Sequence, residues 1–238
     1  MPWGDNLASK IERYCRAIRC HGFCIIENAI PAPLLQALND DLNDDWILSL
    51  GDDLIPHEDR HVRIDDANCH SGHVRALIDN AIVRQVIERV VAWQWRGASR
   101  AFAWTQVTLP GGGPVPLQQD QTHGNLDNIV NAIWPLSAFT RDNGCLHILP
   151  RTHFAPAGSA DDDMVTLFDV KPGSVVLMLG STFRGRNGNY TSTARREILV
   201  RYVPSYPVPS NARRRPWLDW PAIPIRQPTP ALVTLGAA

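Results

Sequence analysis

Hydrophobic positions in the first 95 residues recur every three or four residues, a spacing typical of amphipathic helices. This pattern predicts helices over residues 5–19, 33–46 and 74–93. A short apolar run with β-branched residues, residues 23–30, lies between the first two and predicts a strand that Pro31 ends. We therefore expect the chain to be mainly helical up to about residue 95.

After residue 100 the hydrophobic pattern changes to a period of two or to short continuous apolar runs. Turn signals such as LPGGGP, RDNG, KPGS and RNGN separate these runs, as in an antiparallel sandwich or barrel. The predicted strands lie within AFAWTQVTL, NIVNAIWPLSAF, CLHIL, MVTLFDV, SVVLMLG and REILVRYV. We expect the helices to pack on one sheet of this β region, so that residues 1–203 form a single domain.

The last part of the chain, residues 204–238, contains eight of the nineteen prolines. Proline lacks a backbone N–H, so this segment cannot continue a regular sheet, and we expect an extended tail. Within it, NARRRPWLDWP places Trp217 and Trp220 beside three arginines. These residue types are enriched in protein interfaces, so the segment predicts docking to another chain or to the protein itself.

Charge, hydropathy and cysteine content argue against several classes of protein. A formal net charge of −1 and a pI near 6.7 argue against a nucleic-acid partner. No apolar run approaches the roughly 20 residues of a spanning helix, and the first ten residues lack a signal-peptide core, so we expect a cytoplasmic protein without a membrane partner. Five cysteines without paired CxxC spacing indicate reduced thiols rather than a disulfide framework.

Several segments together carry a family resemblance. DNGCLHILPRTH and the LGST…GN…RR segment are the most specific, and with FAWTQVTLPGGG, PLQQDQ and the helical segment upstream they resemble the phytanoyl-CoA dioxygenase-like branch of the iron(II) and 2-oxoglutarate oxygenases. The resemblance is greatest to members that tailor meroterpenoids and similar natural products, and it runs from about residue 20 to 203. It implies a double-stranded β-helix, or jelly roll: a mainly β core at about residues 100–203 behind N-terminal helices.

The resemblance also implies an iron site that this chain does not keep intact. In the family, a histidine and an aspartate in L-H-x-D and a histidine in S-T-x-H-G hold ferrous iron. Here these motifs read Leu-Gln-Gln-Asp, which ends at Asp120, and Ser-Thr-Phe-Arg-Gly, which contains Arg184. Gln118 and Arg184 thus stand where the family has histidines. We expect no bound metal and no required cofactor.

Replacing the two histidines with glutamine and arginine is unfavourable for iron binding. An amide oxygen is a weak neutral ligand, and a guanidinium offers no lone pair while adding a positive charge. One consequence would be an internal ion pair between Arg184 and Asp120 in place of the metal. The alternative is that Arg184 points into solvent and Asp120 is satisfied by the neighbouring glutamines and water.

Three further positions match the family's pocket for 2-oxoglutarate. Arg195 matches the arginine that binds the distal carboxylate, with Arg196 as the alternative if the register shifts by one residue. Gln106 and Asn189 match other family positions around the same pocket. Without a metal to chelate the 2-oxo acid, we expect only weak 2-oxoglutarate binding, and Arg195 could instead pair with a neighbour in the sheet.

A second possible metal motif is His57-Glu58-Asp59-Arg60-His61, which fits H-E-x-x-H. This zinc signature requires a helix that places both histidines on one face. Pro56 before it and the polar VRIDDAN after it give no such helix. We therefore expect a polar loop without a metal.

Three functional hypotheses remain. The first is a non-catalytic subunit that forms a heterodimer with an iron-competent oxygenase relative, or otherwise a homodimer. The second is a metal-independent isomerase or cyclase that uses Asp120, His123 and Arg184 for acid–base chemistry. The third is an active 2-oxoglutarate-dependent hydroxylase with an altered metal site. The last two would take a small hydrophobic natural product as substrate.

Overall fold

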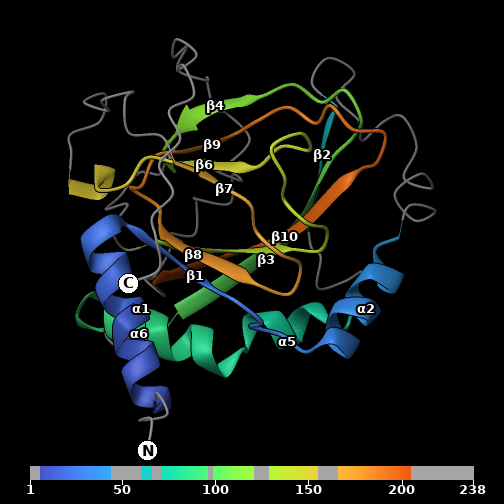
Figure 1. Cartoon of the computed structure of the whole chain (residues 1–238). Helices are drawn as coiled ribbons and strands as arrows, with labels where there is room; N and C mark the ends of the chain where they lie inside the picture. The colour runs from blue at the N-terminus through green and yellow to red at the C-terminus, as the bar shows by residue number, and fades with distance from the viewer. Residues whose placement is uncertain are drawn as a thin grey trace, which may run out of the picture.

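The computed structural model describes residues 6–43, 60–65, 71–95, 99–120, 129–154 and 166–204. Three layers follow one another in space: helices, a six-stranded sheet and a four-stranded sheet (Figure 1). The helices cover the outer face of the larger sheet, and the smaller sheet faces its other side. The proline-rich tail after residue 204 lies outside the described residues, as do His57, Glu58 and His123.

The helical layer contains α1 (Leu7–His21), α2 (Ala32–Asp41), α5 (Val74–Ile78) and α6 (Ala81–Trp95). The Asn6 side chain accepts a hydrogen bond from the Ala8 N–H at 3.3 Å, which caps α1 at its start. Gly22 ends α1 with a φ of 86°, a left-handed conformation that glycine adopts without strain. A 3₁₀ turn, η3 (Thr152–Phe154), lies between residues 146–148 and 166–168, which are two strands of the smaller sheet.

The predicted single helix over residues 74–93 is wrong in one respect, because it is two helices. Asp79 ends α5, and the Asn80 side chain accepts hydrogen bonds from the N–H groups of Ile82 and Val83 at 3.2 and 3.1 Å. An asparagine side chain that accepts hydrogen bonds from the backbone N–H groups two and three residues later is an N-cap, so a new helix begins here. The hydrophobic spacing continues across this break, so periodicity alone did not reveal it.

The larger sheet has the strand order β1-β8-β5-β10-β3-β2, and the smaller one β4-β9-β6-β7. All observed strand pairs are antiparallel. Together they form the predicted jelly roll, which is confirmed. The bounds are β1 (Phe23–Ile26), β2 (His61–Asp65), β3 (Ser99–Thr108), β4 (Val115–Gln118), β5 (Val130–Pro135), β6 (Leu146–Ile148), β7 (Thr166–Phe168), β8 (Val175–Leu179), β9 (Arg184–Arg186) and β10 (Arg195–Pro204).

The two largest apolar clusters among the described residues hold the layers together. One lies between the helices and the outer face of the larger sheet, where Ile18 and Val86 meet Trp134, Val200 and their neighbours. The other lies between the two sheets. Its members are Phe23, Trp104, Ile133, Phe139, Leu146, Ile148, Val170, Val176, Met178 and Leu199. The second core fills only part of the space between the sheets, and charged side chains occupy the rest.

Among the described parts of the chain, no helix combines the length and the apolar character needed to cross a membrane.

Candidate functional site

A cavity of about 200 Å³ lies between the two sheets. Residues from β2, β3, β4, β9 and β10 line it, together with Gln119 and Asp120, which follow β4. Its polar lining residues are Arg63, Gln106, Gln118, Gln119, Asp120, Arg184, Arg186 and Arg201. The cavity therefore contains both former histidine positions, the retained aspartate and several arginines.

Strand β10 places charged side chains between the two sheets because alternate residues of a strand point to opposite faces. Arg195, Glu197, Leu199 and Arg201 share the face toward the smaller sheet. Leu199 belongs to the core between the sheets, and its neighbours Ile198 and Val200 belong to the core under the helices. The sequence RREILVRY thus places three charged side chains inside the protein.

Asp120 is at the centre of one buried cluster, with only 1% of its surface exposed. Its Oδ1 accepts hydrogen bonds from Arg184 Nη2 at 2.6 Å and from Arg201 Nη2 at 2.8 Å, and its Oδ2 accepts one from Asn131 Nδ2. Arg201 Nε also donates to Asn131 Oδ1 at 3.1 Å. The expected pair of Arg184 and Asp120 is therefore present, and a second arginine that was not foreseen reinforces it.

The charge state of Asp120 follows from these contacts. Burial on its own would raise the pKa of this carboxyl. The guanidinium groups of Arg184 and Arg201, with the hydrogen bond from Asn131, outweigh burial and hold its pKa below the usual value. Asp120 is consequently a carboxylate at neutral pH with both oxygens engaged, which makes it a poor proton acceptor.

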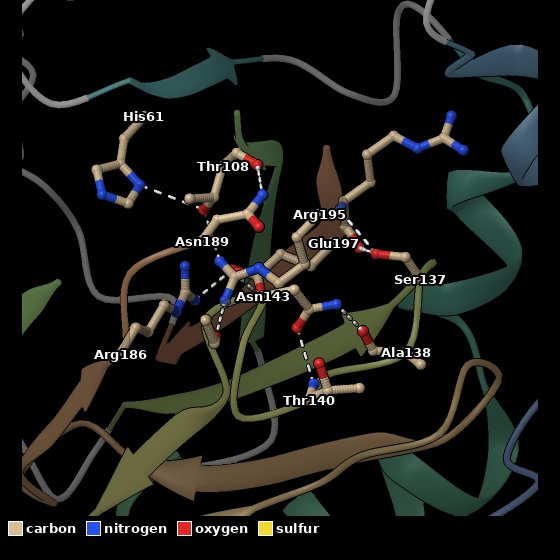
Figure 2. A network of polar contacts seen from close by, with 12 residues as sticks. His61, Thr108, Ser137, Ala138, Thr140, Asn143, Arg186, Asn189, Arg195 and Glu197 are labelled. Atoms are coloured by element: carbon tan, nitrogen blue, oxygen red, sulfur yellow. Dashed lines mark hydrogen bonds and ion pairs between the residues drawn. The ribbon is translucent and has the colours of Figure 1, made fainter. Parts of the chain in front are cut away.

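A second buried cluster surrounds Glu197 (Figure 2). Arg186 Nη2 pairs with Glu197 Oε1, and Arg195 Nη2 lies 4.0 Å from Glu197 Oε2. Arg195 also donates to Thr108 Oγ1 at 2.8 Å and to the Gly144 carbonyl, and its guanidinium stacks over the Phe139 ring. Burial lowers the pKa of Arg186 to about 10, although Glu197 partly offsets this effect.

Gly144, in the DNGC motif, makes this packing sterically possible. A Cβ atom at this position would lie 2.9 Å from the Asn187 carbonyl oxygen and 3.0 Å from Arg195 Nη1. Its φ of 96° also favours glycine. The motif therefore lets the backbone approach the buried guanidinium closely enough to accept its hydrogen bond.

The residues matched to a 2-oxoglutarate pocket separate in space. Gln106 lines the cavity, but Arg195 and Asn189 do not. Arg195 is fully buried among the contacts of the Glu197 cluster, as in the alternative of a pairing within the sheet. Asn189 Nδ2 donates to the carbonyls of Thr108 and Thr193 at 2.9 and 2.8 Å, so its amide joins backbone segments. Arg196 points away from this face and bonds to the Leu42 carbonyl.

His61, the only described member of the H-E-x-x-H motif, begins strand β2 rather than lying on a helix. Its Nδ1 lies 3.2 Å from Thr108 Oγ1 and its Nε2 lies 2.9 Å from the Gly113 carbonyl oxygen. A strand cannot place residues four apart as one helical turn does, so the zinc-protease geometry is not available at this residue.

Sequence reasoning missed Arg201, Asn131 and Arg186 as members of the site. Arg201 lies six residues after Arg195, an even separation that puts both on one face of a strand. That separation was the available signal for Arg201. No comparable signal marked Asn131, because it comes from β5 and meets Asp120 only through the pairing of β5 with β10.

The residues of this site do not fit a ferrous ion. Of the three positions that the resemblance assigns to iron, only Asp120 carries a strong metal ligand, and two guanidinium groups already occupy one of its oxygens. Within the described ranges, no group of three His, Cys, Asp or Glu side chains comes together. Iron binding would require Arg184 to leave Asp120, and would place a cation beside Arg201.

Comparisons with known proteins agree with the fold. A model of the phytanoyl-CoA dioxygenase (PhyH) family matches residues 18–197. Dioxygenase trt7 of Aspergillus terreus is 33% identical over 73 residues, which cover 29% of this chain and 25% of the relative. This match therefore spans about a quarter of that curated protein.

Several solved structures share this fold with the chain. The 2-oxoglutarate-dependent epimerase SnoN of nogalamycin biosynthesis has a TM-score of 0.70 at 14% identity, over 94% of this chain and 96% of that one. The carbocyclase SnoK of the same biosynthesis has a TM-score of 0.67 at 15% identity, over 82% and 84%. HygX of Streptomyces hygroscopicus, solved with nickel, 2-oxoglutarate and hygromycin B, has a TM-score of 0.64 at 15% identity, over 82% and 87%.

Proposed function

The chain belongs to the phytanoyl-CoA dioxygenase (PhyH) family, and from this premise we propose that it is an iron-independent member. In this proposal it serves natural-product biosynthesis as a non-catalytic subunit that supports an active oxygenase relative. The solved neighbours from nogalamycin biosynthesis and the match to an Aspergillus dioxygenase support this biosynthetic setting.

One observation carries the proposal: Asp120 makes an ion pair with Arg184 where the family places iron. Arg184 occupies a histidine position of the iron motif, so the residue that should bind the cation instead supplies a positive charge to the same carboxylate. Arg201 and Asn131 donate to the same carboxylate, so both of its oxygens are engaged. The two guanidinium groups supply the positive charge that a buried carboxylate requires, which supports an iron-free cluster.

The described lining of the cavity offers no group that is well suited to acid–base catalysis. Among the described residues that line it, Asp120 is the one carboxylate, and there is no histidine, cysteine, lysine or tyrosine. The arginines hold the pKa of Asp120 below its usual value, while an efficient general base has a pKa near the working pH. These features favour the non-catalytic hypothesis over an isomerase that uses Asp120.

A supporting role gives the protein a reason to keep its fold. Both apolar cores and the jelly-roll pairing are intact although the iron ligands are replaced. The sequence after Val203 supplies two tryptophans beside three arginines, the residue types that dominate binding energy at interfaces. We propose that the partner is an iron-competent family member, with a homodimer as the alternative.

Co-expression with such a relative tests this function. We expect one stoichiometric complex, and a higher yield or turnover of the relative than when it is expressed alone. Truncation after Val203 should weaken the complex without unfolding the jelly roll. The proposal fails if the two chains elute separately and the relative behaves identically with and without this protein.

A metal-free isomerase or cyclase is the second candidate, because the cavity between the sheets is retained rather than filled. It would use Asp120, Arg184 and His123 on a small hydrophobic natural product. This candidate predicts turnover by the isolated chain in the presence of a chelator, and Asp120→Asn should abolish that turnover. The supporting-subunit proposal predicts no such turnover.

A further inference from the structure

The chain contains two Asn-Gly dipeptides, Asn143-Gly144 in the turn RDNG and Asn187-Gly188 in the turn RNGN. In such a pair the backbone nitrogen of glycine can attack the preceding side-chain amide, because glycine has no side chain to block the approach. Both asparagine side chains are half-buried and both glycines are buried. The two dipeptides therefore share their chemistry and their access to water, and they differ in how the fold holds them.

The side chain of Asn143 is firmly held. Its Oδ1 accepts a hydrogen bond from the Thr140 N–H and its Nδ2 donates to the Ala138 carbonyl, both at 2.7 Å (Figure 2). The backbone of Asn143 also forms an isolated β-bridge with Asn189. Turning the amide carbon toward the Gly144 nitrogen would break two short hydrogen bonds, which is costly in a partly buried site. The fold therefore protects this dipeptide.

The side chain of Asn187 is held much less firmly. Its Nδ2 donates to the Arg141 carbonyl at 3.3 Å, which is a long hydrogen bond, and to Cys145 Sγ at 3.5 Å, which is a weak acceptor. Within the described residues, the Gly188 N–H donates no hydrogen bond. The attacking nitrogen is therefore not engaged, and the amide that it would attack can rotate at little cost.

From this difference we propose that Asn187 is a modification site, at which the chain converts its own asparagine to aspartate and isoaspartate. The Gly188 nitrogen forms a bond to Asn187 Cγ, and the Cγ–Nδ2 bond breaks. Nδ2 leaves as ammonia, carrying the proton that the Gly188 nitrogen loses. Water then opens the cyclic imide: attack at the side-chain carbonyl gives aspartate, and attack at the backbone carbonyl gives isoaspartate, whose main chain runs through the former side chain.

The conversion would reach the buried Glu197 cluster. Either product places a new carboxylate directly after Arg186, which pairs with Glu197. Isoaspartate also lengthens the backbone where packing is tight, because a Cβ on Gly144 would lie only 2.9 Å from the Asn187 carbonyl oxygen and 3.0 Å from Arg195 Nη1. The added carbon must displace one of these neighbours, so we expect the isoaspartate form to unfold at a lower urea concentration than the parent.

Peptide mapping by mass spectrometry, after prolonged incubation of the full chain at neutral pH, tests the site. Trypsin cleaves after Arg141 and Arg186 and so separates the two dipeptides, and digestion in water labelled with heavy oxygen marks any conversion during the digest itself. In the folded protein we expect Asn187 to convert about tenfold faster than Asn143 or more, since two short hydrogen bonds protect Asn143. In urea, where neither is held, the two rates should be similar.

Asn187→Gln is the matched variant, because it keeps an amide but its longer side chain cyclises far more slowly. Anion-exchange chromatography should show an acidic species that grows with time in the parent and is strongly reduced in this variant. Fragment spectra distinguish Asn187 from Asn189 in the same peptide. Equal rates at Asn143 and Asn187 in the folded protein, an Asn187 that converts only in urea, or equal acidic fractions in parent and variant would overturn the proposal.

Discussion

The two faces of β10 have different chemical character and different partners. Ile198, Val200 and Tyr202 point toward the helices and join the apolar core beneath them. Arg195, Glu197 and Arg201 point between the sheets and form ion pairs with one another and with residues from other parts of the chain. One face of this strand is therefore apolar, as in any sheet that helices cover. The other face is charged, and its charged residues are particular to this protein.

This difference teaches that, in the iron-free proposal, the fold of the jelly roll is separable from its metal site. The outer face is stabilised by burial of apolar surface, and this stabilisation is roughly proportional to the buried area. It does not depend on which residues lie between the two sheets. The inner face depends on charge balance, and there a guanidinium takes the place of a metal cation beside Asp120. On the iron-free proposal, the two substituted positions, Gln118 and Arg184, remove the metal site while the helix-facing core stays the same.

The largest expected change is the return of a metal site to the inner face. Gln118→His combined with Arg184→His would restore both imidazoles of the family motif around Asp120 and remove the competing cation. We expect anaerobic ferrous iron binding to rise from far below one per chain toward stoichiometric, measured by metal analysis after desalting.

Gln118→His alone is the control for this rescue and should stay iron-poor, because Arg184 still pairs with Asp120. A folded double variant without iron would indicate that Arg201, which also bonds to Asp120, is sufficient to exclude the metal.

Removing the central carboxylate should give the largest loss of stability. Asp120→Ala leaves Arg184 and Arg201 without their buried counter-charge, and breaking a buried pair in this way typically costs about 3–5 kcal/mol. Ile198→Val, on the outer face of β10, should cost only about 1 kcal/mol. Urea denaturation measures the free energy of unfolding of both variants. Equal losses would show that charge pairing at Asp120 does not dominate the stability of the inner face.

Removing one of the two arginines should cost less than removing the carboxylate. In Arg184→Ala, the Arg201 guanidinium at 2.8 Å and Asn131 still satisfy Asp120. We expect a loss of about 1–3 kcal/mol in the free energy of unfolding. A variant that melts with the parent would mean that Arg184 is not held against Asp120 in solution, whereas a loss as large as that of Asp120→Ala would mean that Arg201 contributes nothing.

Acid should weaken the inner face before the outer one. The folded pKa of Asp120 lies below the unfolded value of about 3.9, so its stabilisation is complete above that pH and is lost as pH falls through the folded pKa. The free energy of unfolding of the parent should therefore fall more steeply below about pH 4 than that of Asp120→Asn, since other carboxylates cancel in the difference. Parallel curves would contradict a lowered pKa.

The smallest expected effect belongs to the outer face. The Tyr202 hydroxyl donates a hydrogen bond to the Ile78 carbonyl at 2.9 Å, which links β10 to α5. Tyr202→Phe keeps the ring in the core and removes this bond, so we expect a loss of about 1 kcal/mol in the free energy of unfolding and no change in iron binding. A change in iron binding would show that the two faces are coupled.

The outer face and the helices were largely predictable from the sequence. Their side chains follow the 3.6- and 2-residue periods over long stretches, and Asn6 and Gly22 mark the ends of α1 with residue types that cap helices. The short strands β2, β4 and β9 were not predicted. Each is five residues or fewer and contains charged residues, proline or glycine, so pairing with distant strands rather than local propensity determines it.

The inner face was predictable only where a motif marked it. The motifs placed Gln118, Asp120 and Arg184 together, and the structure brings all three to one cavity. They left open whether Arg195 would line the pocket or pair within the sheet, because the outcome depends on the close approach of Gly144 and on the Phe139 ring. Asn131 reaches Asp120 from a different strand, so this contact depends on the register between β5 and β10. That register cannot be read from a single sequence.

The central claim is that Arg184 replaces iron as the counter-charge of Asp120, and anaerobic titration of the unmodified protein with ferrous iron and 2-oxoglutarate tests it most directly. We predict far less than one bound iron per chain and no metal-to-ligand charge-transfer absorption. One tightly bound iron per chain, with that absorption appearing when 2-oxoglutarate is added, would contradict the account.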